Sequence, residues 1–210
     1  MSEHDNTQRL RELWERYAPR YDRDIGWCER LQFGDGRAWV CAKATGEVLE
    51  VAIGTGRNLG YYPEETRLTG IDFSPAMLDI ARQRATQLGR LVDLREADAQ
   101  ELPFPDASFD TVVCTLSLCG IPDERAAIAE MYRVLRPGGT LLLLDHIGSH
   151  HRLIHFGQRL LEILTVRTLG DYQTRRPLPL VQGCGFVIQH QQRLKAGTME
   201  RLAATKPGST

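Results

Sequence analysis

The chain has few cysteines, and their spacing forms no familiar pattern. The five cysteines are odd in number and include no Cys-x-x-Cys pair, so neither a zinc ribbon nor a disulfide framework is expected. His151 and His155 lie one helical turn apart, but no third ligand follows at a spacing suited to a metal. Cys114 and Cys119 are expected to be inert buried thiols. We therefore predict no metal site and a reducing, cytoplasmic setting.

Long apolar runs and an excess of one charge are also missing. No stretch approaches the ~20 apolar residues that cross a bilayer, and the polar, acidic first residues are unlike a secretory signal. The 26 basic and 27 acidic residues nearly cancel and are interleaved, so the charge gives no reason to expect a nucleic-acid partner. We predict no integral membrane association, and the sequence indicates no particular oligomeric state.

The middle of the chain alternates between apolar runs and helical patterns. Strands are predicted at residues 48–53, 67–72, 91–96, 109–116 and 140–146, with helices at 58–62, 75–88 and 124–135 and a sharp turn at 137–139. This alternation predicts a doubly wound, Rossmann-like α/β fold with helices on both faces of a mostly parallel sheet.

The two ends of the chain depart from this alternation. A helix is predicted at residues 7–18, ended by Pro19, and helical pieces interrupted by glycines at 22–45. We interpret residues 1–45 as a helical cover and 46–210 as the core. After a polar stretch to residue 179, an antiparallel hairpin at 186–190 and 199–203 is expected to complete a seven-stranded sheet.

Residues 150–169 form a separate amphipathic pattern. Their apolar side is expected to be a wall of a pocket or part of the core. Contact with a membrane surface is the less favoured interpretation, because the apolar side lacks a strongly basic flank.

The chain is organised around residues 47–59. A buried strand carries Glu50 near its end and breaks at Gly54 and Gly56, where the absence of a Cβ lets the backbone approach a ligand. A dinucleotide fingerprint needs a small residue where Leu59 stands, which speaks against an NAD-linked oxidoreductase. A buried acid needs a cationic or donor partner, and the ammonium group of S-adenosylmethionine (SAM) is one.

The ends of the following strands carry residues of matching chemistry. The carboxylate of Asp72 can accept hydrogen bonds from both hydroxyls of a ribose, and Asp98 with Ala99 can meet the amino edge of an adenine. Ligands of doubly wound sheets bind at the carboxyl ends of the strands, so these residues are expected to meet. The candidate SAM-binding residues besides Glu50, Gly54 and Gly56 are Tyr21, Ala52, Asn58, Asp72, Phe73, Met77, Asp98, Ala99, Thr115 and Leu116.

With these residues the chain resembles the class I SAM-dependent methyltransferases, whose first motif is acid-x-x-x-Gly-x-Gly. Residues 46–146 are similar to the ubiquinone-biosynthesis-like branch, which also has segments like 103–110 and 134–139. Ala52 stands where the family usually has glycine or a small polar residue, and Asn58 where a third glycine is common. The resemblance implies that SAM is bound by Glu50, Gly54, Gly56, Asp72, Asp98 and Ala99.

A narrower resemblance extends further along the chain. Residues 113–119, 145–147 and 170–175 are similar to the methyltransferase-like 7 group, thiol S-methyltransferases with an N-terminal membrane anchor that is not found here. A thiol is therefore one hypothesis for the small-molecule acceptor. Methylation of oxygen, nitrogen or carbon in a quinone, lipid precursor or natural product is the alternative, and a SAM-binding protein without catalysis is less favoured.

His146 and Asp171 are the candidate catalytic residues. Methyl transfer requires alignment of the acceptor and, for a protonated nucleophile, removal of a proton. The imidazole of His146 titrates near neutrality and could act as the base, or it could hold a loop. Asp171 could shape the acceptor pocket or form a salt bridge with an arginine. Tyr21 could meet the sulfonium, or pack in the core.

Overall fold

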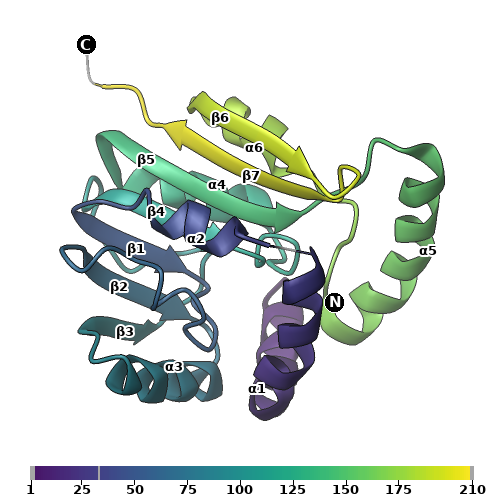
Figure 1. Cartoon of the computed structure of the whole chain (residues 1–210), viewed down its shortest axis with the longest axis horizontal. Helices are drawn as coiled ribbons and strands as arrows, with labels where there is room; N and C mark the ends of the chain where they lie inside the picture. Colours follow the sequence, from purple (N-terminus) through teal and green to yellow (C-terminus); the bar gives the residue numbers. More distant parts are fainter. Residues whose placement is uncertain (1–2, 33, 209–210) are drawn as a thin grey trace.

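The computed structural model describes residues 3–32 and 34–208, with side chains for 7–26 and 34–208. Seven strands form one sheet (Figure 1). In spatial order they are β3 (Val92–Glu96), β2 (Arg67–Asp72), β1 (Glu47–Val51), β4 (Phe109–Thr115), β5 (Leu135–His146), β7 (Met199–Thr205) and β6 (Val187–Leu194). The first five strands pair in parallel, whereas β7 pairs antiparallel with both β5 and β6. The predicted doubly wound sheet with a C-terminal hairpin is confirmed.

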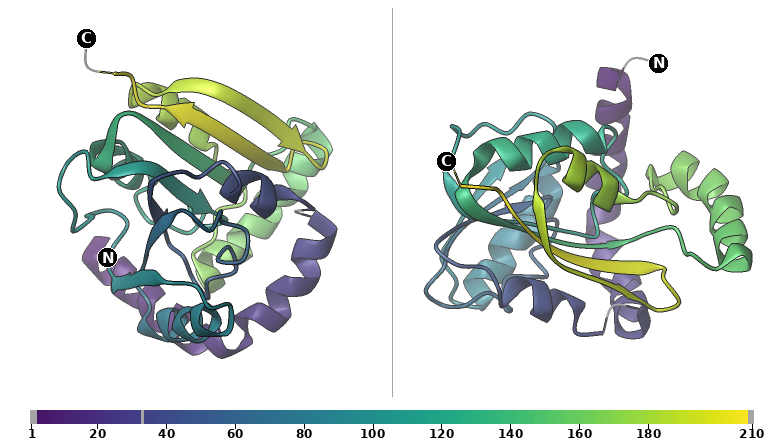
Figure 2. Two further views of the ribbon diagram at one scale, coloured as in Figure 1. Left: turned by 60° about the vertical axis from the view of Figure 1, so that its left-hand side comes forward. Right: turned by 90° about the horizontal axis from the view of Figure 1, so that it is seen from above.

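Helices cover both faces of the sheet (Figure 2). α4 (Glu124–Val134) and α6 (Pro177–Gly183) pack on one face, and α2 (Gly36–Cys41) and α3 (Pro75–Gln87) contribute to the buried cluster on the other. Successive strand residues point to opposite faces. Leu141 and Leu143 of β5 therefore join the first cluster, while Leu142 and Leu144 join the second. Both faces are thus buried along the central strands.

The N-terminal helix differs from the prediction. α1 (Glu3–Gln32) is a single helix of 30 residues that contains Pro19, and the predicted break at Pro19 is wrong. A proline inside a helix costs about 3 kcal/mol, so contacts beyond it must hold the helix together. Asp22, three residues further on, accepts a hydrogen bond from Thr55 (2.7 Å) and forms ion pairs with Arg57 and Arg84. Tertiary contacts thus outweigh the local preference.

Other element bounds also differ. Residues 54–61 form turns instead of the short helix predicted at 58–62. The predicted polar stretch ended at residue 179, but α6 begins within it, at Pro177, and continues to Gly183. β5 starts at Leu135, so residues 137–139 lie within the strand, beside a register shift between Phe109 and Thr111 of β4. A bulge at Gly138, whose φ is +80°, takes the place of the predicted turn.

α5 (Arg152–Leu169) stands apart from the sheet (Figure 1). It meets α1 where Leu10 packs against Gly170 and Arg9 donates to the carbonyl of Arg167. No residue of α5 is buried, so the predicted core packing of its apolar side is wrong. No described helix has the length and apolarity to cross a bilayer. The division at residue 46 and the cytoplasmic setting stay predictions.

Candidate active site

A cavity of about 480 Å³ lies at the carboxyl ends of the parallel strands, within the size range of small-molecule sites. The turns after β1 to β4 line it on one side, and α1 and α5 cover it with residues such as Trp14 and Leu161. Most predicted site residues line this cavity: Tyr21, Ala52, Gly54, Asp72, Phe73, Met77, Asp98, Ala99, Thr115, Leu116, His146 and Asp171. Glu50, Gly56 and Asn58 lie behind its wall and do not line it.

The two glycines after β1 serve different purposes. Both have positive φ values, +57° at Gly54 and +76° at Gly56. A Cβ on Gly54 would meet no atom within 4 Å, so the cavity in front of it is open to a ligand. A Cβ on Gly56 would lie 2.8 Å from Leu59 and 3.3 Å from Ala81 of α3. Gly56 therefore allows close packing of α3, and Gly54 leaves room for a ligand.

Glu50 is paired within the chain. It is 1% exposed, and its two carboxylate oxygens accept hydrogen bonds from Asn58 (2.7 Å) and the hydroxyl of Tyr62 (2.8 Å). Arg37 donates to Asn58 (2.8 Å) and brings a positive charge close to Glu50. Burial nevertheless raises the pKa of Glu50 to about 7. Side chains thus supply donor partners to Glu50, and its predicted contact with SAM stays a prediction.

Asp72 links the ends of the first two strands. Its oxygens accept hydrogen bonds from the backbone N–H groups of Gly54 and Ser74, both at 2.9 Å, and Ser74 in turn caps α3 by accepting from Met77. Burial raises the pKa of Asp72 to about 6. Each carboxylate oxygen can accept more than one hydrogen bond, so Asp72 retains acceptor capacity toward the cavity.

The backbone is strained at the ends of β1 and β4. Ala52 and Leu116 both line the cavity with a φ of +55°, a left-handed conformation that side chains disfavour. Ser117 donates to the carbonyl of Ala52 (3.4 Å) and joins the two strand ends. Such strain is found at functional sites, where the surrounding structure holds it in place.

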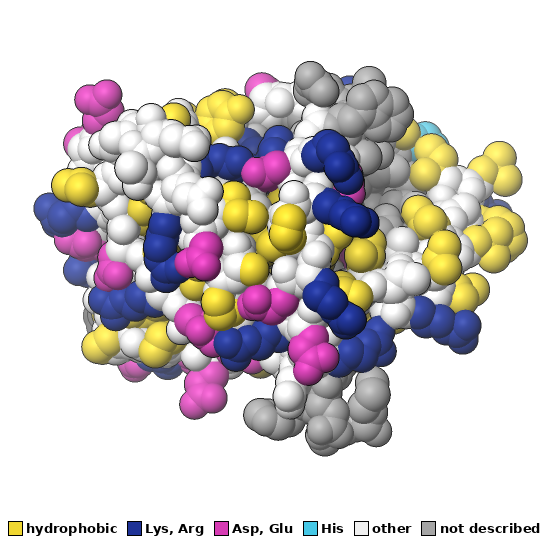
Figure 3. Space-filling view, turned by 90° about the horizontal axis from the view of Figure 1, so that it is seen from below, with side chains coloured by type: hydrophobic (Ala, Val, Ile, Leu, Met, Phe, Trp, Pro, Cys, Tyr) yellow, Lys and Arg dark blue, Asp and Glu magenta, His cyan; other side chains and the backbone are white. Residues whose placement is uncertain are grey.

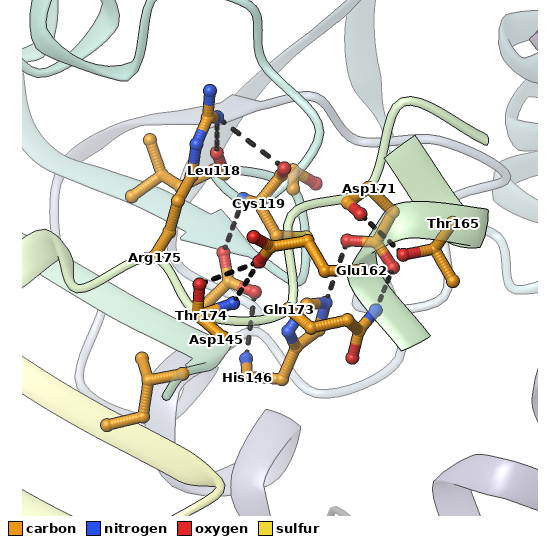
Figure 4. A network of polar contacts seen from close by, with 12 residues as sticks. Leu118, Cys119, Asp145, His146, Glu162, Thr165, Asp171, Gln173, Thr174 and Arg175 are labelled. Carbon is orange, nitrogen blue, oxygen red and sulfur yellow. Dashed lines mark hydrogen bonds and ion pairs between the residues drawn. The ribbon is translucent and has the colours of Figure 1, made fainter. Parts of the chain in front are cut away.

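His146 and Asp171 meet on the opposite side of the cavity, although 25 positions separate them in the sequence (Figure 4). Nε2 of His146 lies 3.0 Å from Oδ1 of Asp171, and Gln173 donates to Oδ2 of Asp171 (2.6 Å). Nδ1 of His146 is buried and has no hydrogen-bond partner among the described residues, and the same holds for Oδ1 of Asp171, whose contact with the histidine is an ion pair. The partner of Asp171 is therefore this histidine, and not the arginine offered as an alternative.

The two charges of the pair stabilise each other. Burial by itself would lower the pKa of His146, but the pairing with Asp171 and the charge of Asp145 outweigh it and raise the pKa above its usual value. Burial would raise the pKa of Asp171, yet its pairing with His146 lowers it. The pairing thus makes His146 a stronger base than a free imidazole.

A metal does not fit this group well. Cys119, His146 and Asp171 place candidate ligand atoms within 4.8 Å of one another. However, burial raises the pKa of the Cys119 thiol well above its ordinary value, and metals bind the thiolate. The 3.0 Å separation between Nε2 and Oδ1 is a hydrogen-bond distance. The group is therefore best described as an ion pair of His146 and Asp171 with the thiol of Cys119 beside it.

Residues 170–175 connect the elements around His146 and Asp171. Thr174 donates to Glu162 of α5 (2.7 Å), and Arg175 donates to the carbonyls of Leu118 (2.8 Å) and Pro122 (3.0 Å) in the loop after β4. This segment therefore fixes α5, Asp171 and that loop relative to one another. The contribution of Arg37 and Tyr62 to the other side of the cavity could not be expected from the sequence, because their partners are distant along the chain.

The chain matches a family model described as a methyltransferase domain over residues 49–143. A demethylmenaquinone methyltransferase of Thermus thermophilus is 35% identical over 185 residues, which cover 80% of this chain and 81% of that protein. The chain belongs to the class I SAM-dependent methyltransferases, in their ubiquinone-biosynthesis-like branch. This membership removes the NAD-linked oxidoreductase from consideration.

Two further similarities concern one more relative and the fold. A demethylmenaquinone methyltransferase of Deinococcus radiodurans is 39% identical over 152 residues, which cover 67% of this chain but 61% of that protein. The chain therefore spans less than two thirds of that relative. A SAM-dependent methyltransferase of Thermotoga maritima has the same fold, with a TM-score of 0.71 at 21% identity, covering 94% of this chain and 99% of that one. The resemblance to the methyltransferase-like 7 group stays a prediction.

Proposed function

We propose that this methyltransferase transfers a methyl group from SAM to a small apolar acceptor with an acidic hydroxyl, such as a quinol or a phenol. The observation that carries the proposal is the ion pair of His146 and Asp171, two residues that line the cavity, together with the lack of a hydrogen-bond partner for Nδ1 of His146 among the described residues. The two relatives named as demethylmenaquinone methyltransferases support a quinol as the acceptor.

The side of the cavity near β1 to β3 suits SAM. Gly54 leaves open space, Asp72 has acceptor capacity for the ribose, and Asp98 lies where the adenine edge is expected. Phe73 and Met77 provide apolar walls for the ring. When bound, SAM supplies an electrophilic methyl group on a sulfonium. These residues hold the donor, and they take no part in moving a proton.

His146 and Asp171 are proposed to move the acceptor's proton. In this proposal Nε2 of His146 keeps its proton beside Asp171, 3.0 Å away, and Nδ1 takes up the proton of the acceptor hydroxyl. As the oxygen loses its proton to Nδ1, electron density would rise on the oxygen and on the adjacent ring carbon, and one of them would form the new bond to the methyl carbon. The bond between that carbon and the sulfur of SAM would break, and S-adenosylhomocysteine would leave. A ring carbon methylated in this way would then lose its own proton to solvent. Asp171 and Asp145 then stabilise the imidazolium, in keeping with the raised pKa of His146.

A thiol acceptor is the second candidate, supported by the resemblance of residues 170–175 to thiol methyltransferases. A thiol that is already ionised near neutrality needs no base. The two candidates therefore differ in whether His146 is needed.

Release of S-adenosylhomocysteine from SAM with a panel of quinols, phenols, thiols and amines tests the proposal. We expect turnover with a quinol or phenol that falls about 100-fold or more in His146→Gln, the scale of a lost general base. His151→Gln, at an exposed histidine beside α5, is the matched control. Turnover only with thiols, or quinol turnover unchanged in His146→Gln, would contradict the proposal.

A further inference from the structure

α5 has its polar and apolar sides reversed relative to an ordinary surface helix. The residues that face the protein are polar: Gln158 donates to the carbonyl of Ile147 (2.9 Å), Glu162 accepts from Thr174, and Thr165 donates to the carbonyl of Asp171 (2.7 Å). A surface helix normally buries its apolar side. Here the hydrogen bonds hold the polar side inward, so the apolar side faces out.

The outward side is a continuous apolar surface. We call it the α5 face; its residues are 39–89% exposed and comprise Leu153, Ile154, Phe156, Leu160, Leu161, Ile163 and Leu164. Figure 3 shows hydrophobic side chains gathered at this end of the molecule, with basic side chains beside them. The other large apolar side chains that the structure describes as exposed are scattered: Tyr61, Leu88, Leu91 and Val187. Clustered apolar exposure marks an interaction surface, whereas isolated residues do not.

The charges beside the α5 face are of one sign. Arg152, Arg159 and Arg167 belong to α5 and are exposed. Glu162, the acid within the helix, is turned inward to Thr174. The basic flank that the sequence pattern did not reveal is therefore present. A second copy of the chain would bring its own arginines against these, whereas an anionic surface would complement them.

We propose that the α5 face docks on the surface of an anionic lipid bilayer. Apolar residues such as Phe156 and Leu160 would enter the boundary between headgroups and acyl chains, and the arginines would contact the lipid phosphates. This is the arrangement of an interfacial helix, which lies in the plane of the membrane and does not cross it.

The α5 face is continuous with the cavity. Leu161 is 49% exposed and also lines the cavity, as does Leu169 at the end of the helix. A docked protein would therefore hold the cavity next to the bilayer, where an apolar acceptor dissolves. The route for the acceptor rests on the proposed function, whereas the docking itself does not.

Sedimentation of the full chain with vesicles, without SAM or an acceptor, tests the docking. We expect binding to phosphatidylcholine vesicles that contain phosphatidylglycerol, and weaker binding to phosphatidylcholine alone. The double variant Phe156→Ser with Leu160→Ser should lose about tenfold or more in partitioning, because apolar area drives interfacial binding. The control Leu91→Ser with Val187→Ser removes exposed apolar residues elsewhere and should bind like the unchanged chain.

A second pair of variants tests the charges. Arg152→Gln with Arg159→Gln should weaken binding to anionic vesicles several-fold. Arg82→Gln with Arg95→Gln changes the net charge equally at exposed sites on α3 and β3 and should not. In addition, Phe156→Trp should shift its emission to shorter wavelength with vesicles, and Leu91→Trp should not.

The proposal is overturned if the unchanged chain does not bind anionic vesicles, or if the α5 and control variants lose binding equally. It is also overturned if sedimentation velocity shows that the α5 face forms a dimer and vesicles have no effect. Circular dichroism of each variant confirms folding, which exposed substitutions should preserve. Because no turnover is measured, failure of the proposed function would leave this result unaffected.

Discussion

The two sides of the cavity differ in how completely their polar groups are paired. On the donor side, around Ala52, Asp72 and Asp98, backbone and side-chain donors meet the buried carboxylates. On the acceptor side, around His146 and Asp171, Nδ1 of His146 is left without a partner among the described residues. Leaving a buried polar atom unpaired costs about 1–3 kcal/mol. The difference agrees with the roles proposed above, in which the donor side binds SAM and the acceptor side moves a proton.

The largest expected effect is on kcat, and it distinguishes proton transfer at Asp171 from cofactor binding at Asp72. Asp171→Asn should lower kcat with a quinol or phenol about 100-fold or more, because an amide cannot stabilise the imidazolium as a carboxylate does. Affinity for S-adenosylhomocysteine, measured by calorimetry, should stay the same. Asp72→Asn should do the opposite, with lower affinity and a smaller change in kcat. If both variants lose affinity for S-adenosylhomocysteine equally, the proposed difference between the two sides is wrong.

The two glycines of the donor side should differ in stability. Gly56→Ala should lower the free energy of unfolding by about 3 kcal/mol, from overpacking against Leu59 and Ala81 and from its positive φ. Gly54→Ala should lower the free energy of unfolding by about 1–2 kcal/mol, from the positive φ alone. It should also weaken binding of S-adenosylhomocysteine, because the added methyl group enters the open space of the cavity. Urea denaturation and calorimetry measure the two quantities, and similar profiles for both variants would contradict this assignment.

The affinity of the donor side for S-adenosylhomocysteine should fall in acid. The pKa of Asp72 in the folded chain is about 6, raised by burial from 3.8. As the pH falls through 6 the carboxyl takes up a proton and no longer accepts hydrogen bonds from both ribose hydroxyls, so affinity should fall by up to about tenfold per pH unit. The folded state holds this proton more tightly, so the contribution of Asp72 to stability is largest below pH 3.8 and is lost as the pH rises through 6.

Calorimetry with S-adenosylhomocysteine between pH 5 and pH 8 checks this dependence. Asp72→Asn should remove the step near pH 6. Glu50→Gln should retain it, because Glu50 does not line the cavity. If the change of affinity near pH 6 remains in Asp72→Asn, a group other than Asp72 causes it.

The smallest expected effect concerns the strain at Ala52. Ala52→Gly relieves a left-handed conformation worth about 1–2 kcal/mol, while the added freedom of the unfolded chain costs about 0.5–1 kcal/mol. Stability should therefore stay equal or rise by up to about 1 kcal/mol. Ala129→Gly, at an exposed position within α4, should instead lose about 1 kcal/mol. Thermal denaturation compares the two, and an equal loss in both would show that Ala52 is unstrained.

The sequence alone determined the features that depend on neighbouring residues. The strand before Gly54, Asp72 at the end of β2 and the Ser74 cap of α3 all follow from short-range preferences. Parallel strands then bring their carboxyl ends to one edge. For this reason the fold and the residues of the donor side could be predicted, even though Glu50 turned out to lie behind the cavity wall.

Only the tertiary structure decided what depends on distant partners. The contacts of Asp22 stabilise α1 beyond Pro19, and residues 170–175 place Asp171 beside His146. The hydrogen bonds of Gln158 and Glu162 turn the apolar side of α5 outward. In each case the energy comes from groups far apart in the chain, and periodicity along the sequence carries no information about which of them will meet.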